Sequence, residues 1–190
     1  MDQLIQDMKN CPQTETQSVY DHGLSVKNHF LQLLEFLKTG QIFGQWRLPE
    51  WLSKYRQEIL NNLLPIQIIE EYLEFHDCSK PYCIQYDENG KRHFPNHAEL
   101  SYLKWLEVGG NPQAAELMKM DMDVHLLKDK DVADFCKRPQ AITLLLSALS
   151  EVHSNSCMFG GIESTSFKIK YKQIEKRGTA VCKNLFDKGN

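Results

Sequence analysis

The apolar positions of this chain recur mostly at helical spacing. In residues 18–38, apolar side chains return every three or four positions, between a candidate N-cap at Ser18 and a stop at Gly40. Similar patterns predict helices over residues 49–63, 66–77, 95–107, 112–127 and 139–153. Strand-like alternation is nearly absent, so the pattern predicts an all-α helical bundle.

Two stretches depart from this pattern. Residues 84–94 form a polar segment with Asn89-Gly90 at its centre, which predicts a short hairpin. Residues 160–190 follow a Gly-Gly pair and are basic. Within them Lys168, Lys170 and Lys172 alternate with apolar residues, which would place three ammonium groups on one side of an extended strand. We predict a basic C-terminal arm or lid, strand-like or irregular, whose lysines bind the phosphates of a substrate.

Composition is that of an ordinary globular protein. The chain has 190 residues, 42% hydrophobic and 25% charged, and no break in composition, which predicts a single domain over 1–190 with its core at about 18–155. The net charge of −3 argues against a protein that coats nucleic acid, because phosphate-backbone binding needs a basic excess. Residues 160–190 carry seven Lys/Arg and three Asp/Glu, so the rest of the chain is acidic.

Cysteine usage and hydropathy indicate the compartment. The six cysteines include no CxxC pair, and the sequence contains no signal-peptide pattern and no apolar run long enough to span a bilayer. We therefore expect reduced thiols, a cytoplasmic location and no membrane partner. Trp46, Trp51 and Tyr55 are candidates for an aromatic surface that would form a homo-oligomer.

Histidines and carboxylates occur on five of the predicted helices. His22 lies in the first long helix, the dyad His76-Asp77 closes a later one, and His97 opens the next. Asp121 and His125 are four residues apart, hence on one face if their segment is helical, and Glu151 and His153 end the apolar helix 139–153. Inward-facing side chains from different helices build the metal sites of helical bundles. Imidazole and carboxylate donors suit Mn, Fe, Co, Zn or Mg.

These residues resemble the signature of the HD-domain metal-dependent phosphohydrolases. "DHGLSV" matches the early histidine with His22, and "FHDCSKP" matches the HDxxK core with His76, Asp77 and Lys80. "FPNHAELSYLKWLE" and "MDMDVHLLK" resemble the segments of the later histidines, at His97 and His125. "LSALSEVHSN" falls where the family has a closing aspartate; Glu151 stands there, with His153 and Asn155 as rivals. The resemblance covers about residues 18–155, and 46–63 looks like an added segment.

The resemblance implies an HD-like bundle and a ligand set of one or two divalent ions. His22, His76, Asp77 and Glu151 would hold one ion, and Asp77 would bridge to a second held by His97 and His125. With a single ion, His97 and His125 would instead contact the substrate or transfer protons. Lys80 would bind a phosphate oxygen, and Asp121 would orient His125 from outside the ligand set.

The expected function is hydrolysis of a phosphoester by metal-activated water. The substrate would be a nucleotide or a related small phosphorylated compound, with a phosphorylated RNA end as a further option, and Mn, Co or Ni would stimulate the reaction. Two alternatives stay open: a di-iron oxygenase on the same scaffold, and a non-catalytic module that binds a nucleotide or an RNA end.

Overall fold

The computed structural model describes residues 1–187 and is helical apart from one two-stranded sheet. This confirms the all-α fold class with a short hairpin. The chain forms two compact units, and each unit is built from two separated stretches of chain. The single-domain prediction for 1–190 stays a prediction. Among residues 1–187, no helix combines the length and the apolarity that crossing a bilayer requires.

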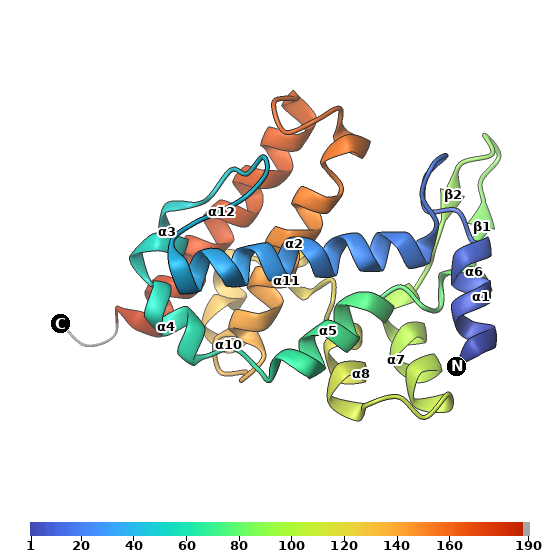
Figure 1. Cartoon of the computed structure of the whole chain (residues 1–190), viewed down its shortest axis with the longest axis horizontal. Coiled ribbons are helices and arrows are strands. Elements are labelled where there is room, and N and C mark those ends of the chain that lie inside the picture. Colours follow the sequence, from blue (N-terminus) through green and yellow to red (C-terminus); the bar gives the residue numbers. More distant parts are fainter. Residues whose placement is uncertain (188–190) are drawn as a thin grey trace. The chain divides into compact units, whose positions relative to one another are not determined.

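The first unit comprises Met1–Ser25 and Gln67–Met122. Within it α7 packs against α8, and α6 contacts both α1 and α7. Its elements, labelled in Figure 1 where there is room, are α1 (Asp2–Asn10), the start of α2 (Val19–Thr39), α5 (Ile66–Phe75), α6 (Lys80–Cys83), β1 (Gln85–Tyr86), β2 (Arg92–His93), α7 (His97–Glu107) and α8 (Pro112–Lys119).

The second unit comprises Val26–Ile66 and the described residues from Asp123 onward. Helix α11 is buried along almost its whole length and packs against α12, which also contacts α3, α9 and α10. Besides the rest of α2, the elements are α3 (Glu50–Lys54), α4 (Arg56–Asn61), α9 (Asp123–Leu126), η1 (Asp129–Asp131), α10 (Val132–Phe135), α11 (Ala141–Ser154), η2 (Ser156–Phe159) and α12 (Thr165–Phe186).

Local sequence signals explain several of these elements. The backbone N–H of Asp21 donates to Ser18 Oγ at 3.1 Å, which confirms Ser18 as the residue that caps α2. In the hairpin, Gln85 pairs with His93 and Tyr86 with Arg92. Gly90 has a φ of +72°, a conformation that favours glycine in a tight turn.

The prediction of an extended C-terminal arm is wrong, because the segment forms the 22-residue helix α12. Its buried side chains recur at a helical period, and this pattern outweighs the two-residue alternation of the lysines. Successive residues of a helix turn by about 100°, so Lys170 lies on the side of the helix opposite to Lys168 and Lys172. Lys168 pairs with Glu163 at 3.1 Å. The buried positions are Phe167, Tyr171, Ile174, Gly178, Val181 and Cys182.

The predicted helix over residues 49–63 is interrupted. The segment divides at Tyr55 into α3 and α4.

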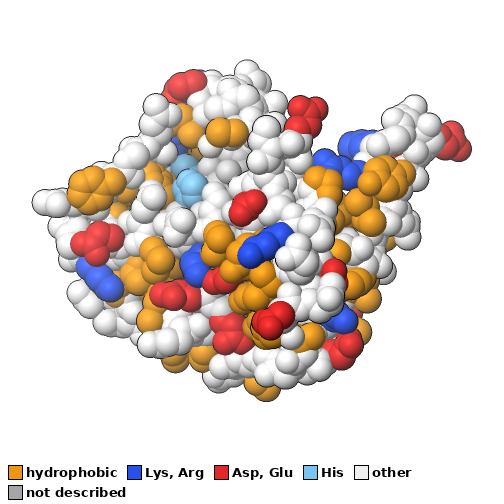
Figure 2. All heavy atoms as spheres, turned by 45° about the vertical axis from the view of Figure 1, so that its right-hand side comes forward, with side chains coloured by type: hydrophobic (Ala, Val, Ile, Leu, Met, Phe, Trp, Pro, Cys, Tyr) orange, Lys and Arg blue, Asp and Glu red, His pale blue; other side chains and the backbone are white. Residues whose placement is uncertain are grey.

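The predicted aromatic interface is wrong, because Trp51 and Tyr55 are buried in the core. Trp46 stacks on His153 with ring centroids 4.3 Å apart. Trp51 and Tyr55 therefore fill the interior of the second unit, whereas Trp46 is half-buried. On the face drawn in Figure 2, acidic and basic side chains are interspersed, in keeping with the small net charge.

The N-terminal cap of α12 gives a first testable prediction. Ser164 Oγ accepts the backbone N–H of Phe167 at 3.1 Å. Ser164→Ala removes this acceptor, and we expect it to lower the free energy of unfolding by about 1 kcal/mol. Urea unfolding followed by circular dichroism measures the loss. Ser166→Ala, the same change at an exposed position of the first turn, is the control; an equal effect of both substitutions would contradict the capping role.

Candidate metal centre

The His76-Asp77 dyad lies in the tight turn that follows α5. Helix α5 ends at Phe75, two residues earlier than the sequence pattern predicts. The turn is fixed by backbone hydrogen bonds from Cys78 N to Phe75 O and from Lys80 N to Asp77 O, both 2.9 Å. Only 2% of either dyad side chain is exposed. A turn of the backbone therefore carries both titratable groups into the interior of the first unit.

The second imidazole comes from the first turns of α2, at a point where two helices nearly touch. A Cβ atom on Gly23 would lie 2.2 Å from the carbonyl oxygen of Glu74, so only glycine fits between α2 and the end of α5. This close approach brings the neighbouring His22 to the dyad, with the His22 and His76 ring centroids 5.3 Å apart. His22 is fully buried. The sequence offers one sign of this contact, a glycine inside an apolar-striped helix.

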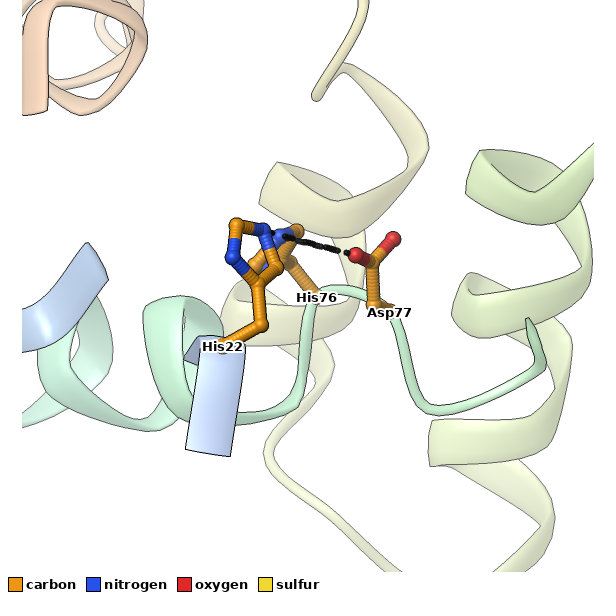
Figure 3. A group of neighbouring side chains, drawn as sticks. All are labelled: His22, His76 and Asp77. Atoms are coloured by element: carbon orange, nitrogen blue, oxygen red, sulfur yellow. Dashed lines mark ion pairs between the residues drawn. The ribbon is translucent and has the colours of Figure 1, made fainter. Parts of the chain in front are cut away.

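The three side chains His22, His76 and Asp77 form one compact cluster (Figure 3). Asp77 Oδ2 lies 3.3 Å from His76 Nε2 and 3.8 Å from His22 Nε2. Each residue offers a ligand atom, and these atoms all lie within 4.8 Å of one another. Two imidazoles and a carboxylate at this spacing can hold one metal ion.

Backbone carbonyl groups fix the orientation of two of the histidines. His76 Nδ1 lies 2.8 Å from Leu73 O, and His97 Nδ1 lies 3.0 Å from Phe94 O. A carbonyl oxygen only accepts, so each Nδ1 carries a proton, and each Nε2 has its lone pair when the ring is neutral. His97 Nε2 lies 3.7 Å from Asp77 Oδ1. Both lone pairs are thus on the nitrogen nearer to Asp77, as metal-binding histidines require.

A buried pair of serines places His97 beside the dyad. Ser79 Oγ donates to the carbonyl oxygen of His97 at 2.8 Å, and Ser101 Oγ donates to Ser79 Oγ at 3.0 Å. Ser101 Oγ also accepts the backbone N–H of Ser79 at 3.2 Å. These bonds tie the start of α7 to the turn after Asp77. The sequence pattern did not indicate either serine, since small polar residues near a dyad are common on surfaces.

Asp77 carries a full negative charge. Burial alone would raise the pKa of its carboxyl group, but the Lys80 ammonium and the imidazoles of His76 and His22 hold it well below its usual range. Lys80 Nζ lies 2.5 Å from Asp77 Oδ2, and only 10% of the lysine side chain is exposed. The predicted Lys80 is therefore part of the centre, where its ammonium already compensates the carboxylate.

The chemistry of this donor set fits a divalent transition metal. An ionised carboxylate buried between two imidazoles is costly unless cations compensate it. Two histidines and one carboxylate are an established set for Fe, and the same donors serve Zn, Mn, Co and Ni. His97 adds a further nitrogen at the edge of the cluster, with 21% of its side chain exposed.

Asp121 does not share a helix with His125. Helix α8 ends at Lys119 and α9 begins at Asp123, so the predicted helix 112–127 is interrupted and Asp121 lies in the turn between. Aspartate is a poor helix former, and its charge is unfavourable near a helix C-terminus. Asp121 Oδ1 accepts the Tyr72 hydroxyl at 2.5 Å.

His125 and Glu151 belong to the second unit, where they contact each other. His125 Nε2 lies 2.8 Å from Glu151 Oε2, and about a fifth of each side chain is exposed. Their contribution to the metal centre, and the choice between one ion and two, stay predictions.

The rivals of Glu151 have structural contacts. His153 Nδ1 donates to Leu149 O at 2.9 Å, and its Nε2 accepts the backbone N–H of Arg47 at 3.2 Å. Burial lowers the pKa of His153 to about 4, so the ring is neutral. Asn155 is the C-cap residue of α11. In this arrangement both nitrogens of His153 serve the packing of the second unit.

Comparison of the chain with models of known protein families, with curated proteins and with solved structures found no match.

Proposed function

We propose that this protein is a metal-dependent phosphohydrolase of the HD-domain type, acting on a nucleotide or a related small phosphorylated compound. The observation that supports the proposal is the convergence of His22, His76 and Asp77, from two separated helical segments, on one buried cluster. These three residues are among the six metal ligands that the resemblance implies. Lys80, the last residue of the HDxxK pattern, contacts the same carboxylate.

The proposed roles follow from where each side chain lies. His22, His76 and Asp77 hold the cation, and Lys80 binds a phosphoryl oxygen of the substrate. A divalent cation bound there would lower the pKa of a water ligand and offset negative charge on the phosphoryl oxygens. His97 is the candidate acid for the leaving oxygen, because its ring lies at the partly exposed edge of the cluster and its Nε2 is on the side of Asp77.

The ion pair between Lys80 and Asp77 favours a second candidate function. Because the ammonium already neutralises the carboxylate, the first unit can be stable without a cation. A protein of this kind would bind a nucleotide or an RNA end through Lys80 without hydrolysing it. Retained metal together with metal-stimulated turnover separates the phosphohydrolase from this binding module.

Metal removal and replacement test the proposed activity. We expect protein treated with a chelator to release no phosphate from a panel of nucleotides. Adding Mn²⁺, Co²⁺ or Ni²⁺ should raise phosphate release to at least about ten times the background of the chelator-treated protein. A bound ion would activate the attacking water and compensate charge on the phosphoryl oxygens. Inorganic phosphate is the measured product.

His76→Ala is the loss-of-function variant for this assay. His93→Ala is its matched control, because His93 is an exposed histidine of the hairpin that pairs with Asp87. Hydrolysis that persists in chelator, or that survives His76→Ala in a folded protein, would contradict the proposal. Oxygen uptake by iron-loaded protein would point to the oxygenase alternative.

A further inference from the structure

The loop between α1 and α2 contacts the metal centre through one side chain. Gln13 Oε1 lies 3.1 Å from Lys80 Nζ and accepts a hydrogen bond from it. Nothing in the sequence pattern singled out this glutamine. Among the described residues, the Lys80 ammonium forms an ion pair with Asp77 and donates a hydrogen bond to Gln13, and the ring of Phe94 lies 5.1 Å from it.

The backbone holds this loop in a fixed shape. Pro12 and Ser18 form an isolated antiparallel bridge, and the N–H of Val19 donates to Cys11 O at 2.8 Å. Inside the loop, the N–H of Gln13 donates to Gln17 O at 2.9 Å. The loop ends at the Ser18 cap of α2, one turn before His22. The position of Gln13 is therefore set by the same helix start that positions a metal ligand.

A second contact fastens the loop to the hairpin. The guanidinium of Arg92, on β2, donates to the carbonyl oxygen of Pro12. A hydrogen bond from arginine to a backbone carbonyl is charge-assisted and stronger than a neutral one. Loop and hairpin thus lie together beside Lys80, and the side chain of Gln13 is only half-buried.

We infer that Gln13 is a positioning residue, which holds the Lys80 ammonium in place to receive the anionic group of the substrate; this inference rests on the proposed function. Lys80 has two partners of different kinds. Asp77 holds it by charge, and this attraction weakens when the carboxylate is committed to a cation. Gln13 is neutral and does not compete with a phosphate for the charge of the lysine. The amide therefore restrains the ammonium while leaving its charge available.

Three substitutions test the inference: Gln13→Ala, Gln17→Ala and Lys80→Met. Gln13→Ala is measured alone and in combination with Lys80→Met. Gln17→Ala is the matched control, because Gln17 belongs to the same loop and contributes its backbone carbonyl, which the substitution keeps. The probes are Mn²⁺ and inorganic phosphate, each titrated by calorimetry, with phosphate added to the Mn²⁺-loaded protein. Steady-state hydrolysis of the best nucleotide supplies KM and kcat.

We expect Gln13→Ala to weaken phosphate binding and to raise KM by about five- to tenfold, the scale of a lost hydrogen bond to a charged group. The affinity for Mn²⁺ should stay within about twofold of the wild type, because the metal ligands are unchanged. The value of kcat should also stay within about twofold, because the lost hydrogen bond supports the bound substrate and the transition state equally. In the Lys80→Met background, Gln13→Ala should have no further effect, since the two residues act as one unit.

Three results for phosphate binding would overturn the inference while leaving the proposed function intact. They are unchanged phosphate binding in Gln13→Ala, an equal loss in Gln17→Ala, and an undiminished effect of Gln13→Ala in the Lys80→Met background. Loss of Mn²⁺ binding in Gln13→Ala would also overturn the inference, because the substitution would then act on the metal ligands and not on Lys80. Wild-type protein that binds no Mn²⁺ and releases no phosphate would overturn the proposed function, and this inference with it.

Discussion

Replacing Asp77 with asparagine is expected to weaken Mn²⁺ binding by at least about 100-fold and to abolish metal-stimulated phosphate release. Asp77 is the anionic member of the cluster, and its low pKa keeps it ionised at neutral pH. Asparagine has nearly the same size but no charge, and half of its amide is a donor that opposes a cation. Changes to residues that merely support metal ligands already cost about 10- to 100-fold in affinity, so loss of a ligand should cost more.

Calorimetric titration with Mn²⁺ and a phosphate-release assay measure both effects. Asp87→Asn is the matched control, because Asp87 lies in the exposed turn of the hairpin, where its side chain accepts the N–H groups of Asn89 and Lys91. We expect this control to bind Mn²⁺ as the wild type does. If Asp77→Asn binds Mn²⁺ with unchanged affinity, the cluster is not the metal centre.

The substitution also leaves Lys80 buried without its carboxylate, which can destabilise the fold. Removing one partner of a buried ion pair costs about 3–5 kcal/mol. The double variant Asp77→Asn/Lys80→Met removes the isolated charge, and its ellipticity should match that of the wild type. A folded double variant that retains tight Mn²⁺ binding would contradict the prediction as directly as the single variant.

Helical periodicity was sufficient to predict several helices of the fold. Helix α2 follows from its apolar spacing and the Ser18 cap, and α7 and α11 from similar patterns. The His76-Asp77 dyad attracts notice because two titratable groups follow an apolar stripe, and burial of both confirms that they need compensation. His22 was assigned to the same set from the resemblance of its segment "DHGLSV", and the structure brings the three residues together.

Other features depend on contacts between segments that no local pattern encodes. The alternating lysines of α12 suggested a strand, but its buried side chains recur at helical spacing, and the segment forms a helix. Ser79 and Ser101 form their hydrogen bond only because the fold brings the turn after Asp77 against α7, and neither serine stands out in the sequence. Gln13 lies 67 residues from Lys80 along the chain, so only folding shows their contact. Asp121 was placed on a helix that its own low propensity helps to end.

The second large effect is expected from Gly23→Ala. The added methyl group would lie 2.2 Å from Glu74 O and 3.2 Å from Leu73 O, so α2 and the end of α5 must move apart. Overpacking of this kind costs about 1–3 kcal/mol, and alanine regains at most about 1 kcal/mol through its higher helix propensity. Because the contacts are with backbone rather than with a flexible side chain, we expect a net loss of about 2 kcal/mol in the free energy of unfolding.

The same substitution should weaken metal binding by about tenfold in the protein that remains folded. Leu73 O accepts the Nδ1–H of His76, and His22 adjoins Gly23, so a shift of these backbones disturbs two ligands at once. Urea unfolding gives the stability, and Mn²⁺ calorimetry at a temperature where the variant is folded gives the affinity.

Gly178→Ala separates general destabilisation from damage to the centre. In the second unit, a Cβ at Gly178 would lie 2.4 Å from the ring of Trp51, so this variant should also be less stable. The contact that it disturbs, with Trp51, belongs to the second unit, so its affinity for Mn²⁺ should equal that of the wild type. Equal losses of Mn²⁺ affinity in the two variants would show that the centre responds to global stability. A loss confined to Gly23→Ala would tie metal binding to the close approach of α2 and α5.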